Sequence, residues 1–183
     1  MAIDLRTRLD KNVLICDGAM GTYLNQKGVS YDRCLDELNI SLPKMVEQIH
    51  REYIDAGADI IETNTFGANR FRLMTHGLEQ QVRDINLKGA KIARDARELS
   101  GIDILVAGSM GPLGKPLQPI GKITLDEAKS AFTEQAEALL EGGIDLFMVE
   151  TISSLDEMAA AVEAIKNKVG THLGSQGLHF AFR

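Results

Sequence analysis

Four short apolar runs, separated by segments with helical periodicity, constrain the fold of this chain more than any other feature of its sequence. The runs are Asn12 to Cys16, Asp59 to Glu62, Ile104 to Ala107 and Asp145 to Val149. Each has the length and composition of a buried strand. Strands that alternate with helices form right-handed βαβ units, so the sequence predicts an α/β fold with a parallel sheet.

Apolar residues recur at intervals of three and four in the segments between the runs. This spacing predicts a helix over Pro43 to Ala56, which Gly57 ends, and a second helix over about Leu78 to Leu99. The inner face of the first helix is expected to consist of Val46, Ile49, Tyr53 and Ala56.

Two capping-box spacings predict where the later helices begin. Thr124 lies three residues before Glu127, and Ser154 lies three residues before Glu157. In this motif each side chain bonds the backbone N–H group of the other residue. The apolar stripe of the fourth helix is expected to close at Gly170.

The alternating pattern fades beyond the fourth helix. A fragment of a fifth strand is expected at Leu178 to Phe182, with no helix after it to cover it. We therefore expect residues 1–170 to form one domain and residues 171–183 to form an atypical tail. A chain of 183 residues is long enough for a complete open sheet, whereas a (βα)₈ barrel needs about 250 residues. Periodicity alone does not distinguish an open sheet from part of a barrel.

The composition argues against several classes of partner. The net charge is −6 and both signs are interspersed, so we expect no binding to nucleic acid. No stretch approaches the roughly 18 consecutive apolar residues of a membrane span, so we expect a cytoplasmic protein without a membrane partner. The two cysteines, Cys16 and Cys34, are typical of a reduced compartment, and neither the cysteines nor the histidines have the spacing of a metal motif.

Small and acidic residues follow the first apolar run, where a parallel sheet opens toward a ligand. The backbone N–H groups of Gly18 to Met20 suit a carboxylate, and Asp17 suits an ammonium group, so this loop has partners for both ends of an amino acid. The alternative is an ordinary turn that Asp17 caps. The nucleotide-binding patterns GxxxxGK[ST] and GxGxxG do not occur here. The segment consists of Asp17, Gly18, Ala19, Met20, Gly21 and Thr22.

Polar side chains also follow the second and fourth runs. Glu62 ends the second run and Thr63 follows it, while Glu150 directly follows the fourth. The carboxyl ends of parallel strands meet at one edge of a sheet, so we expect these groups to share a site for a small zwitterion. The alternative is that they are polar only because strand ends are exposed. The loop Ser109 to Pro119 holds three of the four prolines and is a candidate for a stiff pocket wall.

Four motifs, taken together and in this order, resemble the homocysteine S-methyltransferase family over about Leu14 to Lys168. Within that family the details are most similar to bacterial methionine synthases and to bifunctional enzymes that append a methylenetetrahydrofolate reductase. The resemblance implies a (βα)₈ TIM barrel, of which this chain carries about the first four βα units, or half a barrel. The motifs are Asp17 to Thr22, Glu62 to Phe66, Gly111 to Gly114 and Glu150 to Thr151, each after a predicted strand.

The resemblance also implies a substrate and roles for named residues. Members of the family transfer a methyl group to the thiol of homocysteine, which gives methionine. Asp17 and Glu150 match acids that hold the amino group of homocysteine. The loop Gly18 to Met20 matches backbone amides that meet its carboxylate, and Thr63 matches a pocket residue.

The resemblance implies zinc as the cofactor. Methyl transfer requires a thiolate, whereas a free thiol with a pKa of about 8.5 is mostly protonated at neutral pH. Coordination to zinc removes that proton. The three zinc cysteines of the family lie after the sixth and eighth strands, and this chain stops before both places. Cys16 and Cys34 do not match them. We therefore expect a truncated methyltransferase that is inactive alone and has no catalytic or metal-binding residue of its own. The methyl donor stays open, since relatives use methylcobalamin, betaine, S-methylmethionine or S-adenosylmethionine.

Two other functions are compatible with the sequence. One is a non-catalytic, open-sheet α/β binding module that is complete at 183 residues. The other is a different barrel enzyme in which Glu62 or Glu150 acts as a general base. The sequence does not determine the oligomeric state.

Overall fold

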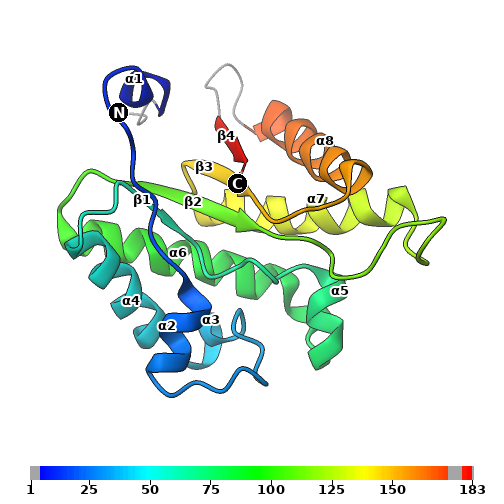
Figure 1. Cartoon of the computed structure of the whole chain (residues 1–183), viewed down its shortest axis with the longest axis horizontal. Coiled ribbons are helices and arrows are strands. Elements are labelled where there is room, and N and C mark those ends of the chain that lie inside the picture. Colours follow the sequence, from blue (N-terminus) through cyan, green and yellow to red (C-terminus); the bar gives the residue numbers. More distant parts are fainter. Residues whose placement is uncertain (1–4, 173–178, 183) are drawn as a thin grey trace.

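Four parallel strands form one sheet in the computed structural model, which describes residues 5–172 and 179–182 (Figure 1). Their order in the sheet follows their order in the chain. A doubly wound sheet instead reverses its order at a switch point. The fragment expected at Leu178 to Phe182 is confirmed as the fourth strand. The strands are β1 (Ile60–Glu62), β2 (Leu105–Met110), β3 (Leu146–Val149) and β4 (His179–Phe182).

Three long helices connect these strands. α6 packs against α7 and α7 packs against α8, so the three helices follow the sheet in turn (Figure 1). This is the alternation of strands and helices that the sequence predicts. None of the helices in the described part of the chain has the length and hydropathy that a membrane span needs. The bounds are Val82–Ser100 for α6, Leu125–Gly142 for α7 and Leu155–His172 for α8.

Shorter elements lie before and between the long ones. α4 (Pro43–Asp55) packs against α6 and confirms the helix predicted over Pro43 to Ala56. Ala56 itself is exposed, because the helix ends one residue before it. The sequence did not predict the remaining helices, which are short and lie mostly in the connections before α4 and after β1. They are α1 (Leu5–Leu9), α2 (Met20–Gln26), α3 (Leu38–Ser41), α5 (Arg70–Leu73) and the 3₁₀ turns η1 (Met74–His76) and η2 (Glu79–Gln81).

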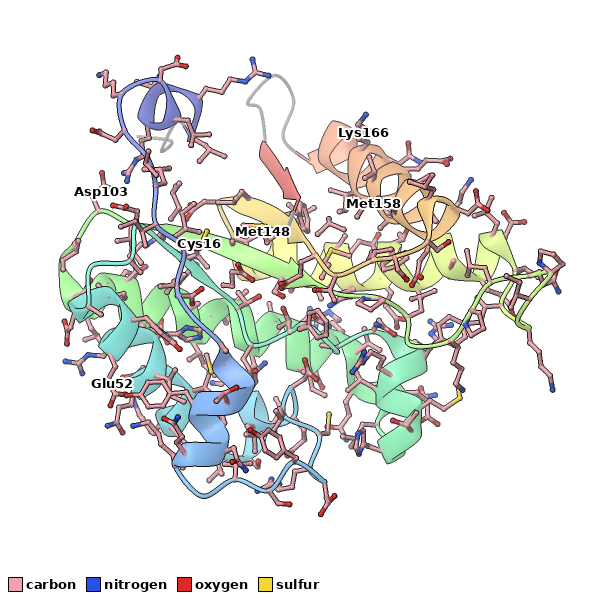
Figure 2. The ribbon with its side chains drawn as sticks, viewed as in Figure 1. Cys16, Glu52, Asp103, Met148, Met158 and Lys166 are labelled. Atoms are coloured by element: carbon pink, nitrogen blue, oxygen red, sulfur yellow. The ribbon has the colours of Figure 1, made fainter. Side chains whose placement is uncertain are left out.

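The two faces of the sheet are covered by different parts of the chain. Ile61 and Phe147 are fully buried in a cluster that contains residues of α6, α7 and α8. The alternate strand residues pack on the opposite face with Leu5 of α1 and with Cys16, which Figure 2 labels together with Met148. This division follows from the two-residue period of a strand. The strand residues of the second face are Ile60, Leu105, Ala107, Leu146 and Met148.

The prediction of a buried strand over Asn12 to Cys16 is wrong. A single parallel bridge joins Cys16 to Ile60, while Val13 is 89% exposed and Ile15 is 61% exposed. The Asp59 carboxylate accepts the Ile15 N–H at 2.9 Å, so a side chain occupies a donor that a longer ladder would use. The segment therefore runs beside β1 without becoming a regular strand.

Two helix ends also differ from the predicted ones. α6 begins at Val82 rather than near Leu78, because the 3₁₀ turn η2 precedes it. α8 continues past Gly170, where the sequence predicts its end. Glycine lowers helix stability by about 1 kcal/mol but does not remove a backbone hydrogen bond, so it does not stop a helix by itself. The capping box of Thr124 and Glu127 at the start of α7 is confirmed.

His50 is an ionisable residue on the buried face of α4. Its side chain is 0% exposed, and neither ring nitrogen has a hydrogen-bond partner among the residues that the structure describes. Burial lowers the pKa of His50 from 6.5 to about 4, because a charged imidazole would lose its hydration without gaining a partner. The folded state thus keeps His50 neutral at pH values where the unfolded chain protonates it.

We predict that His50 makes the fold less stable in mild acid. Between pH 6.5 and about 4 the unfolded state binds the additional proton, so the free energy of unfolding falls as the pH falls through this window. The loss from this residue is about 3 kcal/mol near the lower end. His50→Met removes this pH-dependent contribution. Urea unfolding at pH of about 7 and about 4.5 should therefore show that the free energy of unfolding falls less in acid than it does in the parent chain. The control is His76→Gln at an exposed position, and equal losses in the two variants would contradict the assignment.

Candidate functional site

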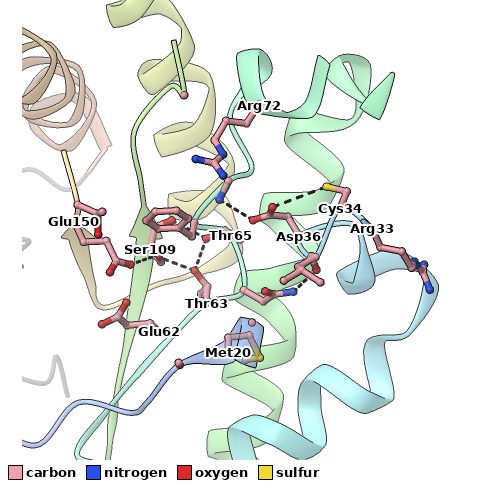
Figure 3. A pocket seen from close by; sticks show the side chains of 18 of the residues that line it. Met20, Arg33, Cys34, Asp36, Glu62, Thr63, Thr65, Arg72, Ser109 and Glu150 are labelled. Atoms are coloured by element: carbon pink, nitrogen blue, oxygen red, sulfur yellow. Dashed lines mark hydrogen bonds between the residues drawn. The ribbon is translucent and has the colours of Figure 1, made fainter. Parts of the chain in front are cut away.

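A cavity of about 890 Å³ opens at the carboxyl ends of β1, β2 and β3 (Figure 3). In Figure 3, Glu62 and Glu150 lie to one side of Thr63, and Asp36 and Cys34 lie to the other. The structure brings together all six residues for which the sequence predicts a role in substrate binding, and those roles remain predictions. The six residues that line the cavity are Asp17, Gly18, Ala19, Met20, Thr63 and Glu150.

Polar side chains reach this cavity because of the alternation along the strands. Glu62, Ser109 and Glu150 each come two residues after a buried residue of the sheet face that points away from α6, α7 and α8. They therefore project from that same face, just where each strand ends. The preceding buried residues are Ile60, Ala107 and Met148.

Asp17 is fixed against the end of β1. Its side chain is 8% exposed, and its carboxylate accepts the Glu62 N–H at 3.0 Å. The Asp17 N–H donates to the Ile60 carbonyl at 2.9 Å. These bonds join Asp17 to β1 and place its carboxyl group at the wall of the cavity.

The loop that follows Asp17 rests on an aromatic ring. The Tyr53 hydroxyl donates to the Ala19 carbonyl at 3.2 Å, and a Cβ added to Gly18 would lie 2.8 Å from the Tyr53 hydroxyl oxygen. The rings of Tyr53 and Tyr23 meet edge to face with centroids 5.8 Å apart. Burial, and then the charge of Asp17, raises the pKa of Tyr53, so the hydroxyl stays a donor at neutral pH. Tyr53 therefore holds the backbone at the start of α2 in one position.

A series of hydrogen-bonded hydroxyl groups connects the three strand ends (Figure 3). The Ser109 N–H donates to Thr63 Oγ1 at 3.0 Å, and the Thr65 hydroxyl donates to the Ser109 carbonyl at 2.8 Å. The oxygens of Thr63 and Thr65 are 2.6 Å apart, and Thr63 is the donor because Thr65 has already given its proton. The Ser109 hydroxyl donates to Glu150 Oε1 at 2.6 Å. The position of Glu150 thus depends on Ser109.

Two members of this series were not singled out by the sequence analysis. Ser109 appeared only as the start of a loop, because the predicted strand ended at Ala107. Side chains two residues apart on a strand share a face, so continuing the strand from Ala107 to Ser109 would have placed Ser109 on the same face as Glu150. Thr65 lies within the Glu62 to Phe66 motif, but its role as a fully buried donor depends on where the Ser109 carbonyl lies, which the sequence does not show.

The second predicted capping box is only half formed. The Ser154 hydroxyl accepts the Glu157 N–H at 3.3 Å, as expected at the start of α8. The Glu157 carboxylate instead accepts the Leu113 N–H at 2.6 Å. A buried backbone donor in the loop after β2 would otherwise lack a partner, so the carboxylate serves that loop rather than its own helix. Glu157 therefore stabilises one wall of the cavity.

The backbone is strained directly after Glu150. Thr151 has φ of 59°, in the left-handed region that β-branched residues rarely occupy. Such a conformation costs on the order of 1 to 2 kcal/mol. Thr151 also lines the cavity, so the strain is located where β3 turns into the loop at the site.

The side of the cavity opposite the acids contains a thiol and a partly buried carboxyl group. Burial raises the pKa of both Cys34 and Asp36, and the Asp36 carboxylate accepts the Gly67 N–H at 2.8 Å. The Cys34 thiol lies 3.9 Å from the same carboxylate. Within residues 5–172 and 179–182, no three His, Cys, Asp or Glu side chains are grouped as metal ligands. The described residues therefore do not fit a zinc ion.

We predict that the hydroxyl series stabilises the fold through Thr65. Thr65→Val keeps the shape of the side chain but leaves the Ser109 carbonyl and the Thr63 hydroxyl without this partner, so the free energy of unfolding should fall by about 1 to 3 kcal/mol. The control is Thr75→Val, at an exposed position where the change should stay within about 0.5 kcal/mol. Urea unfolding measures both, and a Thr65→Val effect no larger than the control would contradict the role of the series.

Comparison with known proteins gives close sequence relatives. A profile of the homocysteine S-methyltransferase family matches residues 14–178. The chain is 40% identical over 168 residues to the methionine synthase of Mycobacterium tuberculosis (strain ATCC 25618 / H37Rv), and equally so to that of Mycobacterium leprae (strain TN). Each match covers 87% of this chain and 14% of the relative, so the chain spans a small part of their length.

Solved structures share the fold. The oxidized form of the homocysteine methyltransferase MmuM from Escherichia coli aligns with 97% of this chain at a TM-score of 0.81 and 27% identity. The metallated form aligns with 90% of the chain at a TM-score of 0.78 and 28% identity. The chain spans 64% and 62% of those structures, less than two thirds of their length. Because the family profile extends over most of its residues, this chain belongs to the homocysteine S-methyltransferase family.

Proposed function

We propose that this chain binds homocysteine in the cavity at the carboxyl ends of its strands, as the amino-acid-binding part of an enzyme that methylates the homocysteine thiol. The observation that carries the proposal is that Asp17, Glu150 and the loop Gly18 to Met20, which are far apart in the sequence, line one cavity. Membership in the family and the names of its relatives, methionine synthase and homocysteine methyltransferase, support this substrate.

The two charged ends of homocysteine require different partners. Asp17 and Glu150 would accept hydrogen bonds from the ammonium group, each worth about 1.5 to 3 kcal/mol. The carboxylate would meet backbone N–H groups of Gly18 to Met20, where α2 begins. Tyr53 holds that backbone in place before the ligand arrives, which lowers the entropy cost of binding. Thr63 would act as a wall residue, because its hydroxyl is already bonded within the protein.

The arrangement of the sheet supports the barrel that the resemblance implies. Strands in chain order with their helices packed in sequence match the wall of a (βα)₈ barrel, and we propose that the chain carries about the first four βα units, or half of one. An open doubly wound module would require a reversal of strand order, which the four described strands do not show. The division into residues 1–170 and a tail of 171–183 remains a prediction.

Methylation itself would require a thiolate. In the family this is the chemistry that zinc supplies, since coordination to the metal deprotonates a thiol. Because the described residues do not fit a zinc ion, no step of the proposal depends on the metal. What these residues would do is hold the amino acid by its charged ends, so that its sulfur projects into the remaining space of the cavity. The expectation that the chain transfers no methyl group by itself, like the cytoplasmic location, remains a prediction.

We predict that the two acids bind the amino group of homocysteine. Isothermal titration calorimetry should show L-homocysteine binding to the parent chain, with the affinity about tenfold or more lower in Asp17→Asn and in Glu150→Gln. For 4-mercaptobutyrate, which lacks the amino group, the same substitutions should leave the affinity within about twofold of the parent. Equal losses for the two ligands would mean that the acids support the structure rather than the ammonium group.

Two controls separate binding from folding and from metal. Glu98→Gln, at an exposed position on α6 outside the cavity, should leave homocysteine affinity unchanged. Added zinc should also leave it unchanged. A gain of about tenfold or more with zinc would contradict the expectation that this chain holds no zinc site, and no binding in the parent chain would overturn the proposed function.

A further inference from the structure

The cavity is larger than one small amino acid needs, and its charges are unevenly distributed. Sites of roughly 300 to 1,000 Å³ enclose drug-sized ligands, and this cavity, at about 890 Å³, is near the upper limit. The proposed partners of homocysteine occupy one part of it, around Glu62 and Glu150. Three cationic side chains line it elsewhere, namely Arg33, Arg72 and Lys115.

Arg72 differs from the other two cations because an aromatic ring, rather than a hydrogen-bonded acid, holds its charged end in place. Its guanidinium group lies over the Phe66 ring at 5.4 Å from the centroid. Arg33, in contrast, pairs with Glu37 at 3.1 Å, and Figure 3 shows it directed away from the centre of the site. Lys115 is exposed. In the described part of the chain, the Arg72 guanidinium makes no hydrogen bond and no ion pair.

The surrounding backbone is built to accept the Arg72 side chain. A Cβ at Gly67 would lie 3.2 Å from Arg72 Nε, and a Cβ at Gly114 would lie 3.1 Å from Arg72 Cγ. The buried Asn69 caps α5, and its Oδ1 accepts the Arg72 N–H at 3.1 Å. The Asn69 amide also donates to the Pro112 carbonyl at 3.1 Å, which ties α5 to the loop after β2. Stem and backbone are therefore both fixed, while the charged end faces the cavity.

Asp36, an acid close to Arg72, already accepts a backbone hydrogen bond. The Asp36 carboxylate accepts the Gly67 N–H at 2.8 Å and makes no hydrogen bond to the Arg72 guanidinium. Burial raises the pKa of Asp36 by more than the charge of Arg72 lowers it, so the attraction between the two groups is weaker than in an ordinary ion pair. A guanidinium group has five donors in a planar arrangement that matches a phosphate or a carboxylate. The donors of Arg72 thus have no partner of this kind in the described residues.

We infer that Arg72 forms an anion-binding subsite in the cavity, which receives a phosphate or carboxylate group of the methyl donor. The inference rests on the proposed function for the identity of the second reactant, and on the geometry of Arg72 for the anion. An anion held by Arg72 would anchor the donor beside the part of the cavity where the homocysteine sulfur projects. The subsite would therefore select donors by a charged group remote from the transferred methyl.

Two simple anions test the subsite without homocysteine. Inorganic phosphate and glutarate are titrated separately into the ¹⁵N-labelled chain in a buffer free of both, and binding is followed by NMR shifts at Gly67 and Gly114. We expect at least one anion to bind the parent chain, and Arg72→Gln to weaken that binding by about tenfold or more. The anion that binds more tightly identifies the donor group as phosphate or carboxylate.

The matched control is Arg70→Gln on the same short helix. Arg70 pairs with Glu134 at 2.8 Å and does not line the cavity, so this change should leave anion affinity within about twofold of the parent. Failure of both anions to bind, or equal affinity in the parent and Arg72→Gln, would overturn the subsite. Homocysteine affinity should be unchanged in Arg72→Gln. If phosphate binding depends on Arg72 while homocysteine does not bind the parent chain, the subsite stands and the proposed function falls.

Discussion

Alternation of side chains along parallel strands is the constraint on which the rest of the structure depends. One set of strand residues, such as Ile61 and Phe147, is buried against α6, α7 and α8. The alternate set faces away from the helices, and it ends with Glu62, Ser109 and Glu150 at the cavity. A shift of one residue in the register of any strand would turn its acid or hydroxyl into the helix layer, where it would lack a partner. Burial of the helix-facing residues thus also fixes the side chains of the site.

The hydroxyl series converts that alternation into a defined geometry. A glutamate at a strand end has several rotamers, and fixing one of them costs side-chain entropy. The bond from Ser109 to Glu150, supported in turn by Thr63 and Thr65, restricts the carboxylate while the protein folds rather than when a ligand binds. The strain at Thr151 is located at the same strand end. Part of the stability of the fold is therefore spent on holding Glu150 in one position.

The sequence predicted the parts of the fold that depend on short-range patterns. Apolar runs located β1, β2 and β3, the Thr124 box located the start of α7, and motif order placed all six proposed binding residues in one cavity. What it missed depends on contacts between distant segments. The Glu157 carboxylate does not complete its capping box, because it accepts the Leu113 N–H, 44 residues away in the sequence. Cys16 forms an isolated bridge to Ile60, because the Asp59 carboxylate accepts the Ile15 N–H that a longer ladder would use.

The charges of the cavity determine how the two reactants of the proposed reaction would be arranged in it. If Asp17 and Glu150 hold the ammonium group and the start of α2 holds the carboxylate, the side chain of homocysteine has to extend away from both, toward the rest of the cavity. The second reactant then has to approach from that remaining space, which Arg72 lines. Arg72 would repel the ammonium group of a homocysteine bound in the reverse direction. A single cation, with its guanidinium held over the Phe66 ring and its backbone bonded to Asn69, would thus both orient the amino acid and attract an anionic donor.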